Sequence, residues 1–144
     1  MRAERLCVPL ARAAIFVIYF WFGCLKAAGF SPAEDLVSRV AEALFPGILA
    51  NGFCLWLGAY EIVVGIAFLV PRIERPALAL LLLHMAATFL PLAFLADDTW
   101  QAFLVPTLIG QYIVKNLAIL ACGLLVYAFR NGAPAPTDPA PAAG

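Results

Sequence analysis

The sequence predicts an all-α integral membrane protein, a bundle of four transmembrane helices with both termini in the cytoplasm. Of its 144 residues, 65% are hydrophobic and only 12% are charged, and the mean hydropathy is +0.96. A water-soluble fold of this length cannot bury so much apolar side chain. The apolar residues are also gathered into long runs, and the charges between the runs are sorted by sign. Together these observations indicate a chain whose solvent is the lipid bilayer.

Four stretches each supply about 20 mostly apolar residues, the length that crosses a hydrocarbon core about 30 Å thick. They cover residues 8–28, 52–70, 77–96 and 107–129. Lipid offers the backbone no hydrogen-bond partners, and the runs lack the alternation of apolar and polar residues found in barrel strands, so each run is expected to be a helix. Residues 1–130 then form a single transmembrane domain.

The charged residues outside the spans define the expected topology. With four crossings, most basic side chains fall on one side of the membrane and most acidic ones on the other. The basic set is Arg2, Arg5, Arg12, Arg72, Arg75 and Arg130, and the acidic set is Glu34, Asp35, Glu42, Asp97 and Asp98, accompanied by Arg39. By the positive-inside rule the basic side is cytoplasmic, which predicts a multi-pass protein of the bacterial inner membrane. The zero net charge argues against a nucleic-acid partner.

Between the first two spans, the residues predict a short extracytoplasmic helix. The stretch from Ser31 to Glu34 has the pattern of a capping box, with Ser31 as N-cap and Glu34 reaching back to its amide. Apolar residues then recur at helical spacing as far as Leu44, and Pro46 follows as a stop signal. We expect an amphipathic helix that covers the mouth of the bundle, and an ordered loop is the alternative.

The remaining segments carry simpler predictions. The short turn at residues 71–76 predicts that the second and third spans are antiparallel neighbours. The tail at residues 131–144 is rich in proline and alanine and is expected to be a disordered cytoplasmic segment. The four cysteines form no C-x-x-C pair, and we interpret them as small buried hydrophobes. They are Cys7, Cys24, Cys54 and Cys122.

Four ionisable side chains lie inside the expected spans, where a charge costs a few kcal/mol and usually faces a partner or a cavity. They are Lys26, Glu61, His84 and Lys115. Counted inward from the outer ends, Glu61 and Lys115 lie at a similar depth of about 12 to 15 Å. His84 should lie slightly deeper, and Lys26 within a turn of the outer surface. We therefore expect the four to converge in the outer half of the bundle, around a Glu61–Lys115 ion pair.

Helical spacing adds neighbours to this cluster, because residues three, four or seven positions apart share a face. The complete candidate site is Tyr19 and Lys26 on the first span, Glu61 on the second, His84 and Thr88 on the third, and Gln111, Lys115 and Asn116 on the fourth. Gly58 and Gly65 lie on the same stripe as Glu61 and permit the close approach of another helix. One histidine and one carboxylate fall short of a metal ligand set, so no metal site is predicted.

Structural explanations exist for each of these groups. The Glu61–Lys115 pair could serve only to set helix register, with the amides of Gln111 and Asn116 as interhelical hydrogen-bond partners. Lys26 could extend its ammonium to the outer interface, as lysines near helix ends commonly do. His84 could be a core histidine whose hydrogen bonds are satisfied.

Three segments on the first, second and fourth spans carry a family resemblance. They are Trp21-Phe22-Gly23-Cys24-Leu25-Lys26, then Gly58-Ala59-Tyr60-Glu61 followed by Gly65, then Gly110-Gln111-Tyr112-Ile113-Val114-Lys115-Asn116-Leu117. Together they resemble the DoxX-like family, especially its YkgB-like branch, over most of residues 8–129. The resemblance implies a four-helix membrane bundle with an extracytoplasmic segment after the first helix. Members of this family look like membrane subunits of quinone-linked sulfur oxidation, associates of redox or thiol-stress enzymes, or assembly chaperones.

The leading hypothesis is a membrane component of a redox or quinone-linked system, in which the polar cluster binds a quinone headgroup or a small anion. Lys26, His84 and Lys115 would be the donors, and Glu61 the counter-charge or proton acceptor. The chain supplies no electron carrier of its own, so a stand-alone enzyme is not expected. Its expected partners are the lipid bilayer, another membrane or redox subunit, or further copies of itself. The alternatives are a non-catalytic scaffold or assembly factor and, third, a small-molecule or proton carrier.

Overall fold

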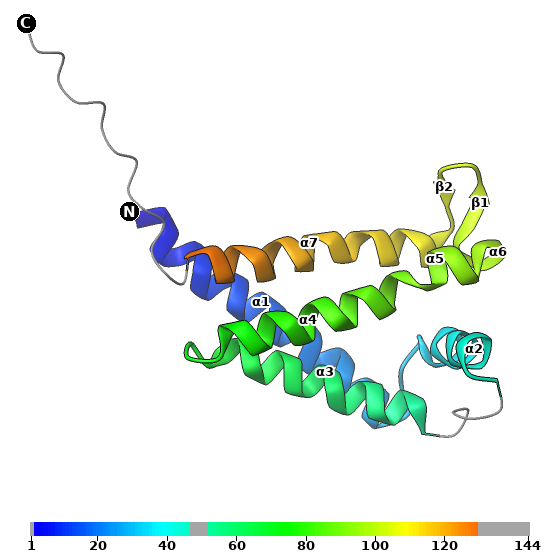
Figure 1. Cartoon of the computed structure of the whole chain (residues 1–144), viewed down its shortest axis with the longest axis horizontal. Coiled ribbons are helices and arrows are strands. Elements are labelled where there is room, and N and C mark those ends of the chain that lie inside the picture. The colour runs from blue at the N-terminus through cyan, green and yellow to red at the C-terminus, as the bar shows by residue number, and fades with distance from the viewer. Residues whose placement is uncertain (1, 47–51, 130–144) are drawn as a thin grey trace, which may run out of the picture.

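The computed structural model describes residues 2–46 and 52–129, and these are helical almost throughout (Figure 1). In chain order the elements are α1 (Arg2–Ala27), α2 (Glu34–Leu44), α3 (Phe53–Leu69), α4 (Glu74–Phe89), α5 (Pro91–Phe94), α6 (Ala96–Thr99), β1 (Trp100–Ala102), β2 (Val105–Pro106) and α7 (Leu108–Phe129). The tail expected to be disordered, residues 131–144, lies outside the described residues.

Within the described ranges, three helices are long and apolar enough to cross a membrane, as judged by length and composition: Leu6–Ala27, Glu74–Phe94 and Leu108–Phe129. They coincide closely with the first, third and fourth expected spans. The second expected span is also helical and apolar, but α3 has only 17 residues. At about 1.5 Å per residue it is about 25 Å long, shorter than a typical hydrocarbon core.

The long helices pack around one apolar core. α1 and α3 contact each other most extensively, α7 packs on both α1 and α4, and α4 also contacts α3. Ile15, Val64, Phe68, Leu81 and Val126 are almost completely buried in this core. One end of the bundle holds the turn between α3 and α4 together with the last turn of α7, and the other holds α2 and the β1–β2 hairpin (Figure 1). We call these the turn end and the α2 end.

The helix expected between the first two spans is present, but its start differs from the prediction. α2 begins at Glu34, its N-cap is Ala33, and no side chain caps it. Ser31 instead forms a local turn, in which its hydroxyl accepts a hydrogen bond from the Ala33 amide at 3.2 Å. The expected capping box is therefore wrong, because Ser31 satisfies amides in a turn that precedes the helix.

α2 is attached to the rest of the α2 end by packing and by charge. It contacts α3 and α5, and Ala41 is its buried residue. Arg39 forms an ion pair with Asp98 of α6 and a second one with Asp35 at 3.4 Å. The hydrogen bond from Arg39 to Asp98 is the main cause that raises the pKa of Arg39 above its ordinary value. Arg39 thus ties α2 to α6.

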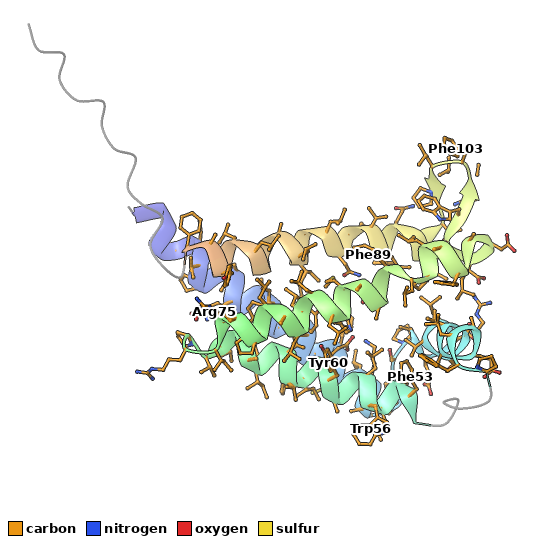
Figure 2. All side chains as sticks on the ribbon, in the orientation of Figure 1. Phe53, Trp56, Tyr60, Arg75, Phe89 and Phe103 are labelled. Atoms are coloured by element: carbon orange, nitrogen blue, oxygen red, sulfur yellow. The ribbon has the colours of Figure 1, made fainter. Side chains whose placement is uncertain are left out.

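The segment between α4 and α7 is more structured than the sequence predicts. The third span is interrupted at Leu90, because Pro91 starts the short helix α5. Beyond α6, β1 and β2 pair as an antiparallel hairpin, and at its turn Leu104 has a φ of 58°. Phe103 stands at the hairpin tip with 92% of its surface exposed (Figure 2). The sequence carries no hairpin signal at this turn, because the turn lacks the glycine or asparagine that usually marks one.

Candidate functional site

The centre of the candidate site is the carboxylate of Glu61, which lies between α1 and α4. The ammonium of Lys26 donates hydrogen bonds to both of its oxygens, at 2.9 Å to Oε1 and 2.7 Å to Oε2. His84 Nε2 lies 3.0 Å from Oε1. The three side chains are only 7% to 10% exposed. Glu61 therefore forms a buried, bidentate ion pair with one neighbouring helix and a hydrogen bond with another.

The second ring nitrogen of His84 extends the chain of hydrogen bonds to α1. Nδ1 lies 3.0 Å from the Tyr19 hydroxyl, and the Thr88 hydroxyl donates to the His84 carbonyl at 2.9 Å. The Glu61 carboxylate can only accept, so His84 Nε2 must carry the proton that it donates to Oε1. In a neutral imidazole Nδ1 is then the acceptor, and the Tyr19 hydroxyl donates to it.

We call Tyr19, Lys26, Glu61 and His84 the Glu61 network. It is an unbroken hydrogen-bonded chain in which every side chain is buried or nearly so. With a neutral imidazole, one ammonium and one carboxylate, its net charge is zero. That is the least costly charge state for groups held away from water.

Aromatic rings cover two sides of the imidazole. The Tyr60 ring stacks on His84 with centroids 5.9 Å apart and planes at 16°, and the Tyr19 ring meets it edge-on at 5.2 Å. The Tyr60 hydroxyl donates to the carbonyl of Leu80 at 2.8 Å, which fixes the ring against α4 (Figure 2). Tyr60 was absent from the predicted site, because a residue adjacent to Glu61 on a helix projects about 100° away from it.

Close packing of α1 on α3 explains why Lys26 reaches Glu61. A Cβ atom on Gly23 would lie 2.7 Å from the Gly58 carbonyl, and one on Gly58 would lie 2.7 Å from the Gly23 carbonyl. The two backbones therefore touch at this point. Lys26 and Glu61 each follow a contact glycine by three residues on antiparallel helices. Helical side chains lean toward their own N-terminus, so these two lean toward each other.

The expected Glu61–Lys115 ion pair is wrong, because Glu61 takes Lys26 and His84 instead. Lys115 is exposed, and its ammonium lies 5.0 Å from the centroid of the Tyr112 ring. The buried face of α7 includes Ile113. Two residues along an α-helix correspond to a rotation of about 200°, so Lys115 projects from the opposite face. Similar depth on two helices was not sufficient evidence of contact.

Of the other expected site residues, some join the Glu61 network and some lie apart from it on α7. Tyr19 and Thr88 join the network at His84, as expected from their spacing. Gln111 is exposed and Asn116 is partly exposed on α7. Of the eight predicted site residues, the structure thus brings together the five on α1, α3 and α4, and it separates the three on α7.

A second buried ion pair, at the turn end, was not predicted. Arg12 on α1 contacts Glu74 at 2.5 Å and donates to the carbonyl of Phe68 at 2.9 Å. Glu74 is 6% exposed. The arginine thus ties the end of α3 and the start of α4 to α1. Both charges lie near span ends, where charge is ordinary, so their positions in the sequence gave no signal of pairing.

Among the residues that the structure describes, no group of three or more histidine, cysteine, aspartate or glutamate side chains is arranged to hold a metal ion. The four cysteines carry free thiols: Cys7 is exposed, and Cys24, Cys54 and Cys122 are partly buried. Comparison with protein-family models, with curated proteins and with solved structures gives no match.

Proposed function

We propose that the chain is a multi-pass protein of the bacterial inner membrane that crosses the bilayer four times, with both termini in the cytoplasm. Three helices of sufficient length support this, and a slightly thinned bilayer or interfacial flanking residues accommodate the shorter α3. The turn end carries Arg72 and Arg75, whereas Asp97 and Asp98 lie at the α2 end. The positive-inside rule then assigns the turn end to the cytoplasm.

Within this bundle, the Glu61 network is proposed to bind the headgroup of a quinone in a redox system. The observation that carries the proposal is the buried chain of four groups that can all hold or pass a proton. Reduction of a quinone to a quinol takes two electrons and two protons at its carbonyl oxygens. The network can supply protons to those oxygens, and a separate redox subunit supplies the electrons.

Lys26 is the group best placed to hold a quinone carbonyl. An ammonium has three N–H donors, and two of them bond to Glu61. The third has no acceptor among the residues that the structure describes, although only 9% of the side chain is exposed. A carbonyl oxygen is the acceptor that such a donor would bind.

The alternative is a non-catalytic scaffold or assembly factor in which the same network only fixes helix register. One observation favours it: both oxygens of Glu61 are already satisfied within the chain. A proton carrier is the third reading, because the same hydrogen-bonded chain is typical of proton pathways. The DoxX-like resemblance fits all three and remains part of this proposal.

Extraction of bound quinone distinguishes these functions. The protein is purified from native membranes in mild detergent, and quinone in the organic extract is quantified per mole of protein by mass spectrometry. Wild type and Lys115→Met should retain the same quinone content, whereas Lys26→Met and Glu61→Gln should lose most of it. Lys115→Met is the matched control, because it removes an equivalent lysine outside the network. Absence of quinone from the wild type, or equal content in all four proteins, would contradict the proposal.

A further inference from the structure

The exposed face of α7 carries polar side chains inside a helix that is proposed to cross the membrane. Gln111 and Lys115 are exposed one helical turn apart, and Ala118 continues the same face. We call these three residues the α7 polar face. Asn116 lies beside them and is partly exposed. Among the described residues, no hydrogen bond or ion pair is made by the side chains of Gln111, Lys115 or Asn116.

Lipid cannot satisfy these groups. Lys115 is seven residues from the start of α7 at Leu108, about 10 Å inside the helix. A charge inside a bilayer is energetically unfavourable and normally faces protein. Its contact with the Tyr112 ring is only partial compensation, since that ring is itself 62% exposed. The charge of Lys115 is compensated only when a negatively charged hydrogen-bond acceptor packs against it.

A second copy of this chain does not provide that acceptor. The carboxylates described within the long helices are those of Glu61 and Glu74, and both are buried and paired. The exposed carboxylates of α2 and α6, such as Asp97, lie at the α2 end, outside the long helices. A symmetric contact through α7 would also bring two Lys115 side chains together, and like charges repel. A carboxylate at the depth of Lys115 is therefore better supplied by a different protein.

We infer that the α7 polar face is the docking surface for a transmembrane helix of another membrane protein, which carries an aspartate or glutamate opposite Lys115. The Gln111 amide offers a second hydrogen bond across this interface, and Ala118 allows the helix to approach closely. The inference rests on the proposed membrane placement of α7. It does not depend on what the Glu61 network binds.

The test is photo-cross-linking in native membranes from a photoreactive amino acid at Ala118. The matched position is Val63, which is 56% exposed on α3, a helix that is not among the main packing partners of α7. We expect the Ala118 probe to give an adduct with a transmembrane peptide that contains an acidic residue, identified by sequencing the cross-linked peptide. The Val63 probe should give mainly lipid adducts. Lys115→Met should lower the protein adduct at Ala118 at least tenfold, and Lys115→Arg should preserve it.

A charge exchange completes the test. Lys115→Glu should abolish the adduct, and replacing the partner's acidic residue with lysine should restore it. The inference is overturned if Ala118 cross-links only to lipid, if the adduct is a second copy of this chain, or if Lys115→Met leaves the yield unchanged. Absence of lipid adducts at both positions would instead show that the membrane placement itself is wrong. The thermal stability of each variant is measured first. We expect it to equal that of the wild type, because Lys115 is exposed.

Discussion

Replacement of Glu61 by glutamine probes the network with almost no change of shape. The variant keeps one oxygen that can accept a hydrogen bond, but its amide nitrogen presents N–H donors where Glu61 accepts them. In the wild type those positions face the Lys26 ammonium or His84 Nε2 at 2.7 to 3.0 Å. The substitution therefore sets one donor against another and leaves a buried cation without its counter-charge.

The expected loss of stability is large for a substitution that changes so few atoms. Removing one partner of a buried ion pair typically destabilises a protein by 3–5 kcal/mol. A loss of about 3 kcal/mol corresponds to a roughly 150-fold change in the unfolding equilibrium. The Lys26→Met/Glu61→Gln double variant should be more stable than Glu61→Gln alone, because it buries no uncompensated charge. Lys115→Met should stay within about 0.5 kcal/mol of the wild type.

The measurement is reversible unfolding of the purified protein in mixed micelles of mild detergent and dodecyl sulfate, followed by tryptophan fluorescence. Glu61→Gln should unfold at a clearly lower dodecyl sulfate fraction than the wild type. Equal stability of the two proteins would contradict this prediction, because it would mean that burial of the Lys26 charge does not depend on Glu61. A double variant less stable than Glu61→Gln would also refute it.

Three further predictions follow from the packing and the topology. Gly23→Ala and Gly58→Ala should each destabilise the protein by about 1–3 kcal/mol in the same assay, because either methyl group would collide with the facing backbone; wild-type stability would show that the helices do not touch there. Arg12→Gln should cost about 2 kcal/mol by breaking a charged hydrogen bond, and Arg72→Gln at an exposed site should cost almost nothing; equal effects would contradict the buried pair. In a cysteine-free background, a membrane-impermeant thiol reagent added to intact cells should label Asp97→Cys but not Arg72→Cys; the reverse pattern would invert the topology.

The sequence predicted the long helices well because their signal is local. A run of about 20 apolar residues is helical in lipid whatever its neighbours are. The turn at residues 71–76 correctly predicted that α3 and α4 are adjacent. The start of α2 was missed because the Ser31 hydroxyl can either cap a helix or accept a hydrogen bond in a preceding turn. The hairpin was missed because its turn at Leu104 lacks the glycine or asparagine that usually marks a hairpin.

The candidate site was only half predictable for a physical reason. Position along a span determines depth, but it does not determine which way a side chain points. Tyr19 was grouped correctly with Lys26, and Thr88 with His84, because spacing along one helix relates residues within it. The choice of Lys26 over Lys115 as the partner of Glu61 depends on how α1 and α3 pack. That packing is set by the glycine contact, which the sequence showed only as a stripe of small residues near Glu61.

The imidazole of His84 reports directly on the Glu61 network, because His84 is the only histidine in the chain. Nitrogen-15 magnetic resonance of histidine-labelled protein in bilayers, made without a histidine tag, should show one protonated and one unprotonated ring nitrogen. Tyr19→Phe should shift the unprotonated one. Addition of a short-chain quinone should shift the resonances of the wild type and of Lys115→Met but not those of Lys26→Met. Resonances that do not respond to quinone in any of these proteins would contradict the claim that the Glu61 network is the binding site.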